Sequence, residues 1–365
     1  MAQEPQQSGP SQQTLTLVVA LLASLLVGKF LAAQTELITK FAKLIAVYGV
    51  GDILLLQMRK AARATAVQLQ TEVPPLVEQI ISGAVAEGVA AGTTASAGGP
   101  GEPPEAKLPG WFDPFQSHAE MSAQAIRDDL NGKLNQLGYR ITRYADDVYQ
   151  SVAQSGISQV LGDTAKVAQR KAYTDLTSKG VTGFRDSRGR NWSLSAYVEM
   201  AVRTSAQRAY NVSHLGRMQS LGIDLFTVTD DGHPCPLCAP WQGKVLSALP
   251  DSRADATIED ATAAGLFHPN CKHTLVAYFP GVSNIPAPRE WTQEDQQRYD
   301  NTQQQRAIER DIRAAKQEVA GAYDAEMRAQ AEAKVRAAQK RMRDFLGMTG
   351  LNRNSRREQL DLGNR

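Results

Sequence analysis

CPLCAPWQGK (residues 235–244) and HPNCKH (residues 268–273) contain all three cysteines of this chain. Each segment holds two metal-ligand side chains separated by two residues, a spacing that lets both reach one ion from a tight turn. Three sulfurs and one imidazole suit tetrahedral Zn2+, and four protein ligands leave no open position for a substrate. The segments therefore predict a structural zinc site with a small module folded around it. The predicted ligands are Cys235, Cys238, His268 and Cys271.

Other interpretations of this cluster stay open. His233 lies two residues before the first segment and His273 ends the second, so either could replace His268 as the fourth ligand. A disulfide between Cys235 and Cys238 would form in an oxidising compartment. The three thiols could also fill a core without metal, because cysteine packs as a small apolar side chain. A single activated cysteine nucleophile fits less well, because all three thiols stand at ligand spacing.

The overall composition favours helices. Hydrophobic residues make up 42% of the 365 residues and charged residues 21%, as in ordinary globular proteins. Aromatic residues are only 6%, and Ala, Gln and Arg are frequent. The formal net charge of +2 gives little support for a nucleic-acid-binding protein. No Walker loop or HExxH motif is present, and we expect no enzymatic activity.

The N-terminal region contains an apolar segment, TLTLVVALLASLLVG (residues 14–28). Its length falls short of the roughly 20 residues that span a bilayer. The residues before it lack the positive charge of a signal peptide. We therefore expect a buried or partner-docking helix, with a membrane-inserted segment or a cleaved signal as alternatives. Further helices should follow to about residue 70, broken near Gly49 and Gly51.

The middle of the chain alternates between segments that interrupt regular structure and segments that predict helices or strands. AGTTASAGGPGEPP (residues 91–104) has no large apolar residue and predicts a linker. FRDSRGRNW (residues 184–192) has the turn chemistry of a hairpin. A helix should then run to about Leu221 and end at Gly222. Next to the cysteines, two short strands are predicted, at residues 225–228 and 244–246.

The C-terminal third predicts long amphipathic helices, because apolar residues recur at spacings of three or four between Ile308 and Phe345. Packing against the body of the protein and docking onto another subunit explain this pattern equally well. Residues 351–365 are basic and polar. We expect a solvated tail there, with contact to DNA or to an acidic neighbour as the alternative. The arginines of this tail are Arg353, Arg356, Arg357 and Arg365.

These features predict an α+β fold that is mainly α. It should have a helical N-terminal arm, a mixed core with a small zinc-knuckle β module, and long C-terminal helices. The predicted segments are a helical arm (1–90), a flexible linker (91–110), a helical core region (111–220), the Cys/His knuckle module with short strands (221–285), the amphipathic helices (286–350) and the basic tail (351–365).

Several ordered motifs carry a family resemblance. The chain resembles the phage minor capsid protein 2 family, which is related in style to Mu-F-like head morphogenesis proteins. The similarity extends over roughly residues 140–360. The motifs, in order, are YVEMAVRTSAQRAYN (197–211), CAPWQGKV (238–245), NCKH (270–273), FPG (279–281) and RYDNTQQQRAIERDIRAAK (298–316).

The resemblance implies a minor structural protein of a tailed-phage head, made in the host cytoplasm and built into the virion in a few copies. It implies docking at the portal or the capsid interior during head assembly and genome packaging. The expected partners are the portal protein and the major capsid or scaffold protein, not a membrane. Two other hypotheses stay open. One is an ADP-ribosyltransferase-like virion enzyme centred on Arg203, Thr204 and Ser205, and the other is a membrane-active ejection protein using residues 14–28.

Overall fold

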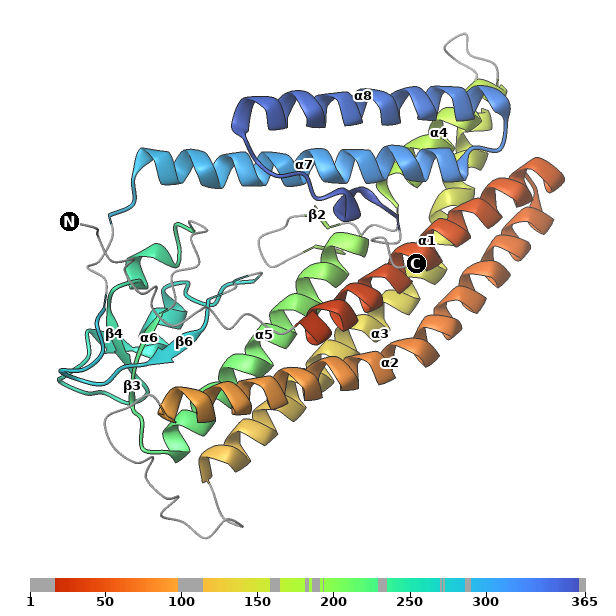
Figure 1. The fold of residues 1–365 in the computed structure, drawn as a ribbon. Helices are drawn as coiled ribbons and strands as arrows, with labels where there is room; N and C mark the ends of the chain where they lie inside the picture. Colours follow the sequence, from red (N-terminus) through yellow and green to blue (C-terminus); the bar gives the residue numbers. More distant parts are fainter. Residues whose placement is uncertain are drawn as a thin grey trace. The chain divides into compact units, whose positions relative to one another are not determined.

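The structure is a computed structural model (Figure 1). It describes residues 17–97, 114–157, 165–180, 184–185, 191–192, 194–228, 235–269, 271, 273–285 and 290–360. The chain divides into two compact units, which are described separately. The knuckle unit comprises Met1–Ala20, Gln79–Arg127 and Arg203–Tyr299. The helical unit comprises Leu21–Glu78, Asp128–Val202 and Asp300–Arg365.

Helices dominate, which confirms the mainly α, α+β class. The helices are α1 Leu17–Tyr48, α2 Asp52–Ala97, α3 Pro114–Ile157, α4 Ala165–Lys179, α5 Leu194–Ser220, α6 Ile258–Ala263, α7 Gln293–Gly321 and α8 Ala325–Thr349, with short 3-10 turns η2 Ala239–Trp241 and η3 Ser355–Glu358. The strands are β1 Phe184–Arg185, β2 Asn191–Trp192, β3 Leu225–Val228, β4 Val245–Ser247, β5 Ala256–Thr257 and β6 Leu275–Ala277.

In the helical unit, α1 is a core helix. Phe41 of α1 is fully buried and stacks on Tyr144 of α3, with ring centroids 6.1 Å apart. The Tyr173 hydroxyl of α4 donates to the Ile38 carbonyl at 2.9 Å. The helix is also long and apolar enough to cross a membrane, a test that buried core helices pass as well. It ends at Gly49, whose φ of +60° supplies the predicted break before α2.

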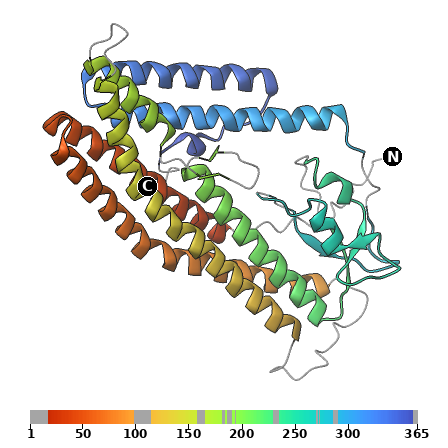
Figure 2. The same ribbon diagram turned by 180° about the vertical axis from the view of Figure 1, so that it is seen from behind.

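The C-terminal helices α7 and α8 form a hairpin and lie side by side in both ribbon views (Figures 1 and 2). Asp324 caps α8 by accepting from the Met327 amide at 2.9 Å. The apolar stripes of the two helices pack on one another and are buried within the protein, which favours internal packing over docking for these side chains. The stripe consists of Ile308, Ile312, Ala338, Met342 and Phe345.

The solvated tail predicted after residue 350 is only partly seen in the residues described, which end at Leu360: residues 352–356 are exposed, but Arg357 and Glu358 engage the rest of the unit. The Arg357 guanidinium pairs with Glu309 at 2.8 Å and with Glu199 at 3.0 Å. Arg353 donates to both carboxylate oxygens of Glu358, at 2.7 Å each, and Glu358 is buried. A high content of arginine does not by itself distinguish internal ion pairs from solvated charge. Arg356 is exposed, and Arg365 lies outside the described residues.

In the knuckle unit, a four-stranded sheet has the order β5-β4-β3-β6. β3 pairs antiparallel with β4 and β6, and β5 is parallel to β4. Strand β3 has the predicted bounds, and β4 begins one residue later than predicted. Gly222, with φ +79°, follows the end of α5 as predicted. The hairpin expected at residues 184–192 is present in the helical unit as β1 and β2, with Phe184 opposite Trp192.

The start of the predicted linker is helical, because α2 continues to Ala97. Gly88, just before the predicted linker, and Gly92, within it, bring the α2 backbone against α5. A Cβ added at Gly92 would lie 2.9 Å from the Arg217 Cβ, and one at Gly88 would strike the Tyr210 carbonyl oxygen. The Arg217 side chain also donates to the Thr93 hydroxyl at 2.9 Å. The small residues that resembled a linker thus serve a close contact between helices. Residues 98–110 lie outside the described residues.

Candidate metal centre

The first Cys/His segment forms a tight turn that leads into η2. The amides of Cys238 and Ala239 both donate to the Cys235 carbonyl, at 3.1 and 2.9 Å. This geometry places two side chains, three residues apart, on the same side of the turn. The Cys238 thiol is fully buried and the Cys235 thiol is half-buried.

The second segment follows α6 and makes a similar turn. The Cys271 amide donates to the His268 carbonyl at 2.8 Å. Phe267, just before it, has a φ of +58°, a left-handed conformation that bulky side chains rarely adopt. This strained residue turns the chain sharply into the His268–Cys271 segment.

The four predicted ligands lie in one cluster of the knuckle unit, linked through Cys238, although not all four ligand atoms lie within 4.8 Å of one another. The Sγ atoms of Cys238 and Cys271 are 3.7 Å apart, and the Cys235 Sγ is 2.9 Å from the His268 Nε2. Two sulfurs at about 2.3 Å from a tetrahedral zinc ion would be about 3.8 Å apart, so the Cys238–Cys271 pair already has the spacing of two zinc ligands. The donor set fits a metal of this kind.

The structure also brings His273 into the cluster. Its Nδ1 lies 3.3 Å from the Cys271 Sγ, and its side chain is buried. Two groups of three potential ligands result, Cys235–Cys238–His268 and Cys238–Cys271–His273, and in each the ligand atoms lie within 4.8 Å of one another. Cys238 belongs to both. His233, the other alternative, lies outside the described residues.

Each of the two imidazoles has one nitrogen facing a thiol and the other facing a second polar group. The His268 Nδ1 lies 2.9 Å from the Pro269 carbonyl oxygen. The His273 Nε2 lies 3.2 Å from the side-chain amide of Gln242, a residue of the CAPWQGK motif. Hydrogen bonds of this kind fix the orientation of metal-binding histidines. Gln242 was not predicted as part of the site, because residues 242 and 273 are brought together only by the fold.

The electrostatics of the cluster suit a cation. Hydrogen bonding from the Cys238 thiol is the main cause that lowers the pKa of both Cys235 and Cys271. The same two contacts raise the pKa of Cys238, which therefore keeps its proton. The hydrogen bond to Cys235 raises the pKa of His268 to about 9. Thiolates are the ligand form of cysteine, and a metal ion would take the place of the shared protons.

The surroundings indicate a structural role. The cluster lies against the apolar core of the knuckle unit, and Cys238 and Cys271 are themselves part of that core. The sheet contributes most of the other large side chains. These neighbours are Phe226, Leu246, Leu266 and Leu275. Such a position suits an ion that holds loops on a sheet.

The residues of the alternative enzyme hypothesis do not form a site. Arg203, Thr204 and Ser205 are consecutive in α5, where successive side chains diverge by about 100°. Arg203 is exposed, whereas Ser205 is buried. They therefore point to different surroundings.

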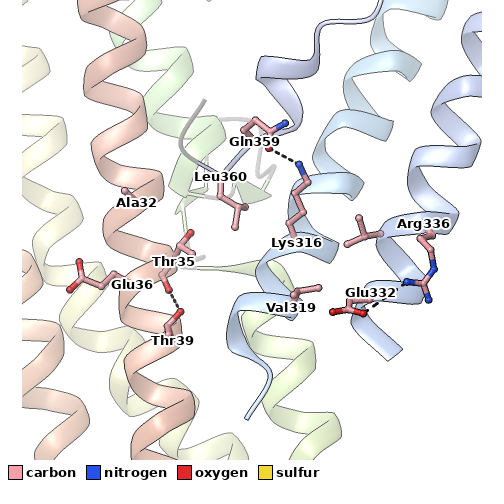
Figure 3. Close-up of a pocket in the computed structure, with 11 residues that line it drawn as sticks. Ala32, Thr35, Glu36, Thr39, Lys316, Val319, Glu332, Arg336, Gln359 and Leu360 are labelled. Carbon is pink, nitrogen blue, oxygen red and sulfur yellow. Dashed lines mark hydrogen bonds and ion pairs between the residues drawn. The ribbon is translucent and has the colours of Figure 1, made fainter. Parts of the chain in front are cut away.

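A pocket of about 780 Å3 lies in the helical unit, between α1, α7 and α8 (Figure 3). Its polar side chains engage one another or the backbone. Lys316 donates to the Gln359 side chain at 2.8 Å, and the Thr39 hydroxyl donates to the Thr35 carbonyl at 2.9 Å. Val319 and Leu360 contribute apolar surface. No arrangement of catalytic groups is evident among these described residues.

Comparisons with known proteins agree with the motif resemblance. The model of the family described as phage minor capsid protein 2 matches residues 29–347. A protein of Lactococcus phage LL-H described as "Structural protein" is 31% identical over 141 residues, which cover 36% of this chain and 38% of that relative. The match thus spans well under half of the relative's length. No solved structure matches.

Proposed function

The chain belongs to the phage minor capsid protein 2 family, and from this membership we propose that it is a minor structural protein of a tailed-phage head. It docks at the portal or the capsid interior during head assembly and genome packaging. The observation that carries the proposal is the family match across residues 29–347. The similarity to a phage structural protein supports it.

The proposed partners are the portal protein and the major capsid or scaffold protein, and the chain is made in the host cytoplasm before it enters the head in several copies. Ion pairs occupy Arg353 and Arg357, whereas Arg356 is exposed and has no ion pair among the described residues. Phosphate contacts of proteins come largely from unpaired basic side chains. DNA contact through this tail is therefore a minor part of the proposal.

The head proposal is tested by quantitative mass spectrometry of purified, nuclease-treated phage heads. We expect the chain at a small fixed number of copies per head, measured against the major capsid protein. Heads made when the gene is silenced should be fewer or defective in packaging, and supplying the chain in trans should restore them. Complete absence of the chain from wild-type heads would contradict the proposed function.

We further propose that the Cys/His cluster binds one structural Zn2+ through Cys235, Cys238, His268 and Cys271. When bound, the ion would join the two turns and hold the loops around the sheet. Structural zinc can contribute on the order of 10 kcal/mol to folding. The convergence of these side chains supports the proposal, and His273 is the competing fourth ligand.

The zinc proposal is tested by elemental analysis of the purified protein, where we expect about one equivalent. His268→Ala should reduce bound zinc to below half an equivalent, whereas His273→Ala should retain it. The exposed His118 provides the control, because His118→Ala should change nothing. The reverse result for the two cluster histidines would assign His273 as the ligand, and zinc-free wild-type protein would refute the site.

A further inference from the structure

We infer that the turn between α1 and α2 is a docking tip that inserts into an apolar socket, rimmed by carboxylates, on a neighbouring protein of the phage head. The inference rests on the proposed head function. The docking tip consists of Val47, Tyr48, Val50, Ile53 and Leu56.

The docking tip concentrates exposed apolar side chains. Val47 is 73% exposed, Ile53 61% and Leu56 64%, while Tyr48 and Val50 are 48% and 40% exposed. Single exposed apolar residues are common on protein surfaces, but five large ones within ten consecutive positions form a patch. Contiguous apolar patches usually mark an interaction site.

Nothing in the described part of the helical unit covers the turn itself. A Cβ added at either Gly49 or Gly51 would meet no atom within 4 Å. The layer directly beneath is packed, because Ile45 and Leu54 are buried. The tip is therefore the end of a helical hairpin with a packed interior, and its outer surface has no partner among the described residues.

Ion pairs link the two helices of the tip to each other and to α3. Arg59, one turn from the tip on α2, pairs with Asp146 of α3 at 2.6 Å. Lys29 of α1 pairs with Glu72 of α2 at the same distance, 2.6 Å. A preordered surface loses less conformational entropy on binding, which favours a specific partner.

Basic side chains flank the docking tip. On α2, Ile53, Leu56, Lys60 and Arg63 follow one another at spacings of three and four, so the exposed face changes from apolar to basic away from the turn. On α1, the exposed Lys43 stands four residues before Val47, on the same face. These three basic groups have no ion-pair partner in the described ranges. A partner with carboxylates around an apolar socket would complement both parts of the surface.

The charges of the docking tip favour such a protein over two other occupants, a lipid surface and a second copy of this chain. Asp52 lies in the middle of the tip, in the first turn of α2, and its side chain is exposed. Hydrocarbon would desolvate that carboxylate at high cost, which disfavours a lipid surface. Two copies packed tip to tip would bring the basic groups of both copies to the same interface. A second protein of opposite charge avoids both penalties.

The tip fits the centre of a larger interface. Specific interfaces bury about 800 Å2 on each partner, which exceeds what five side chains present. Aromatic side chains such as Tyr48 are typical of the centres of interfaces, with charged groups at the rim. We therefore expect Lys43 and Lys60 to lie at the rim and Tyr48 to be covered by the partner.

The inference is tested in phage-infected cells by placing a photo-crosslinking amino acid, p-benzoylphenylalanine, at position 48 of the full chain. Tyr139 is the matched control site, because it is a tyrosine of the same unit and is 77% exposed. We expect one dominant adduct with another phage protein from position 48, at least tenfold stronger than any from position 139. Adding Lys43→Glu and Lys60→Glu should reduce its yield at least fivefold, whereas the exposed Lys171→Glu should not.

Three results would refute the inference: equal adducts from both positions, adducts only with lipid or with a second copy, or no adduct. Thermal unfolding of each variant shows that loss of crosslinking is not loss of folding, because all the changed positions are exposed. The copy number of the chain in purified heads is measured in parallel. Its absence from heads with a strong adduct would refute the head function alone, and its presence without an adduct would refute the docking tip alone.

Discussion

His214 shows how a single buried side chain joins elements within the knuckle unit. Its Nδ1 lies 3.3 Å from the Gly88 carbonyl oxygen of α2, and its Nε2 lies 2.9 Å from the Leu275 carbonyl oxygen of β6. Tyr210 stacks on the ring, with centroids 5.6 Å apart. Burial is the main cause that lowers the pKa of His214, so the folded protein holds the neutral imidazole at neutral pH.

This pKa predicts a loss of stability in acid. Below the ordinary histidine pKa of about 6.5, the unfolded chain binds a proton that folded His214 resists, so the free energy of unfolding falls as pH falls. One group contributes at most about 1.4 kcal/mol per pH unit. Urea unfolding of wild type and His214→Gln between pH 8 and pH 5 measures the difference. If the free energy of unfolding had the same pH dependence in both proteins, His214 would not be the cause of the acid sensitivity.

Arg357 and Arg356 are neighbours in sequence with opposite environments. Arg357 bridges Glu309 and Glu199, and the Glu309 side chain is only 4% exposed. Removing one member of a buried pair leaves a desolvated charge and costs about 3 kcal/mol. Arg357→Ala should therefore lower the free energy of unfolding by about that amount, whereas Arg356→Ala should change it by less than about 0.5 kcal/mol. Similar unfolding midpoints for the two variants would contradict the internal role of Arg357.

At the scale of elements, the contact between α2 and α5 depends on the absence of side chains. The backbone of α2 approaches α5 at Gly88 and Gly92, and neither position leaves room for a Cβ without movement. Glycine in a helix is unfavourable by about 1 kcal/mol relative to alanine, so its presence here is explained by the close approach. The segment forms a helix because its backbone packs against α5.

Gly88→Ala should therefore destabilise the protein by about 1–3 kcal/mol, because the added methyl group meets the backbone of α5. Gly132→Ala in α3 is the matched control, since a Cβ there meets nothing within 4 Å. That change should stabilise by up to about 1 kcal/mol. Chemical denaturation of both variants gives the comparison, and equal effects would argue against a close contact between α2 and α5.

At the scale of the whole molecule, the two units have different sources of stability. The helical unit buries long apolar stripes and paired charges, as in the α7–α8 hairpin. The sheet of the knuckle unit has strands of only two to four residues. Strands this short gain little from their own pairing. The proposed zinc ion would therefore matter most for the sheet.

Chelation tests this difference. Treatment with EDTA should increase amide hydrogen exchange in β3, β4 and β6 and leave α7 and α8 unchanged, because the proposed ion links only the turns of the knuckle unit. Exchange is followed by mass spectrometry of peptides. Cys271→Ser serves as the control and should show the increased exchange before EDTA is added. Unchanged exchange in all three strands of the wild type would count against a structural metal.

Local patterns in the sequence predicted much of the fold. The periodicity of apolar residues indicated the long helices, Gly49 and Gly222 marked helix ends, and residues 225–228 were identified as a strand. These features depend on nearest neighbours and backbone sterics, so they can be inferred without knowledge of distant contacts. The ordered motifs likewise identified the family that the comparisons show.

Contacts between residues far apart in the sequence determined the features that these local patterns did not predict. Whether glycine-rich sequence forms a linker or a helix depended on α5, and whether an arginine-rich end is solvated depended on Glu309 and Glu199. The spacing of cysteines and histidines predicted a set of side chains that could bind a metal. Only the fold placed Gln242 beside His273 and left the docking tip uncovered, because burial and partner choice are properties of packing between segments far apart in the chain.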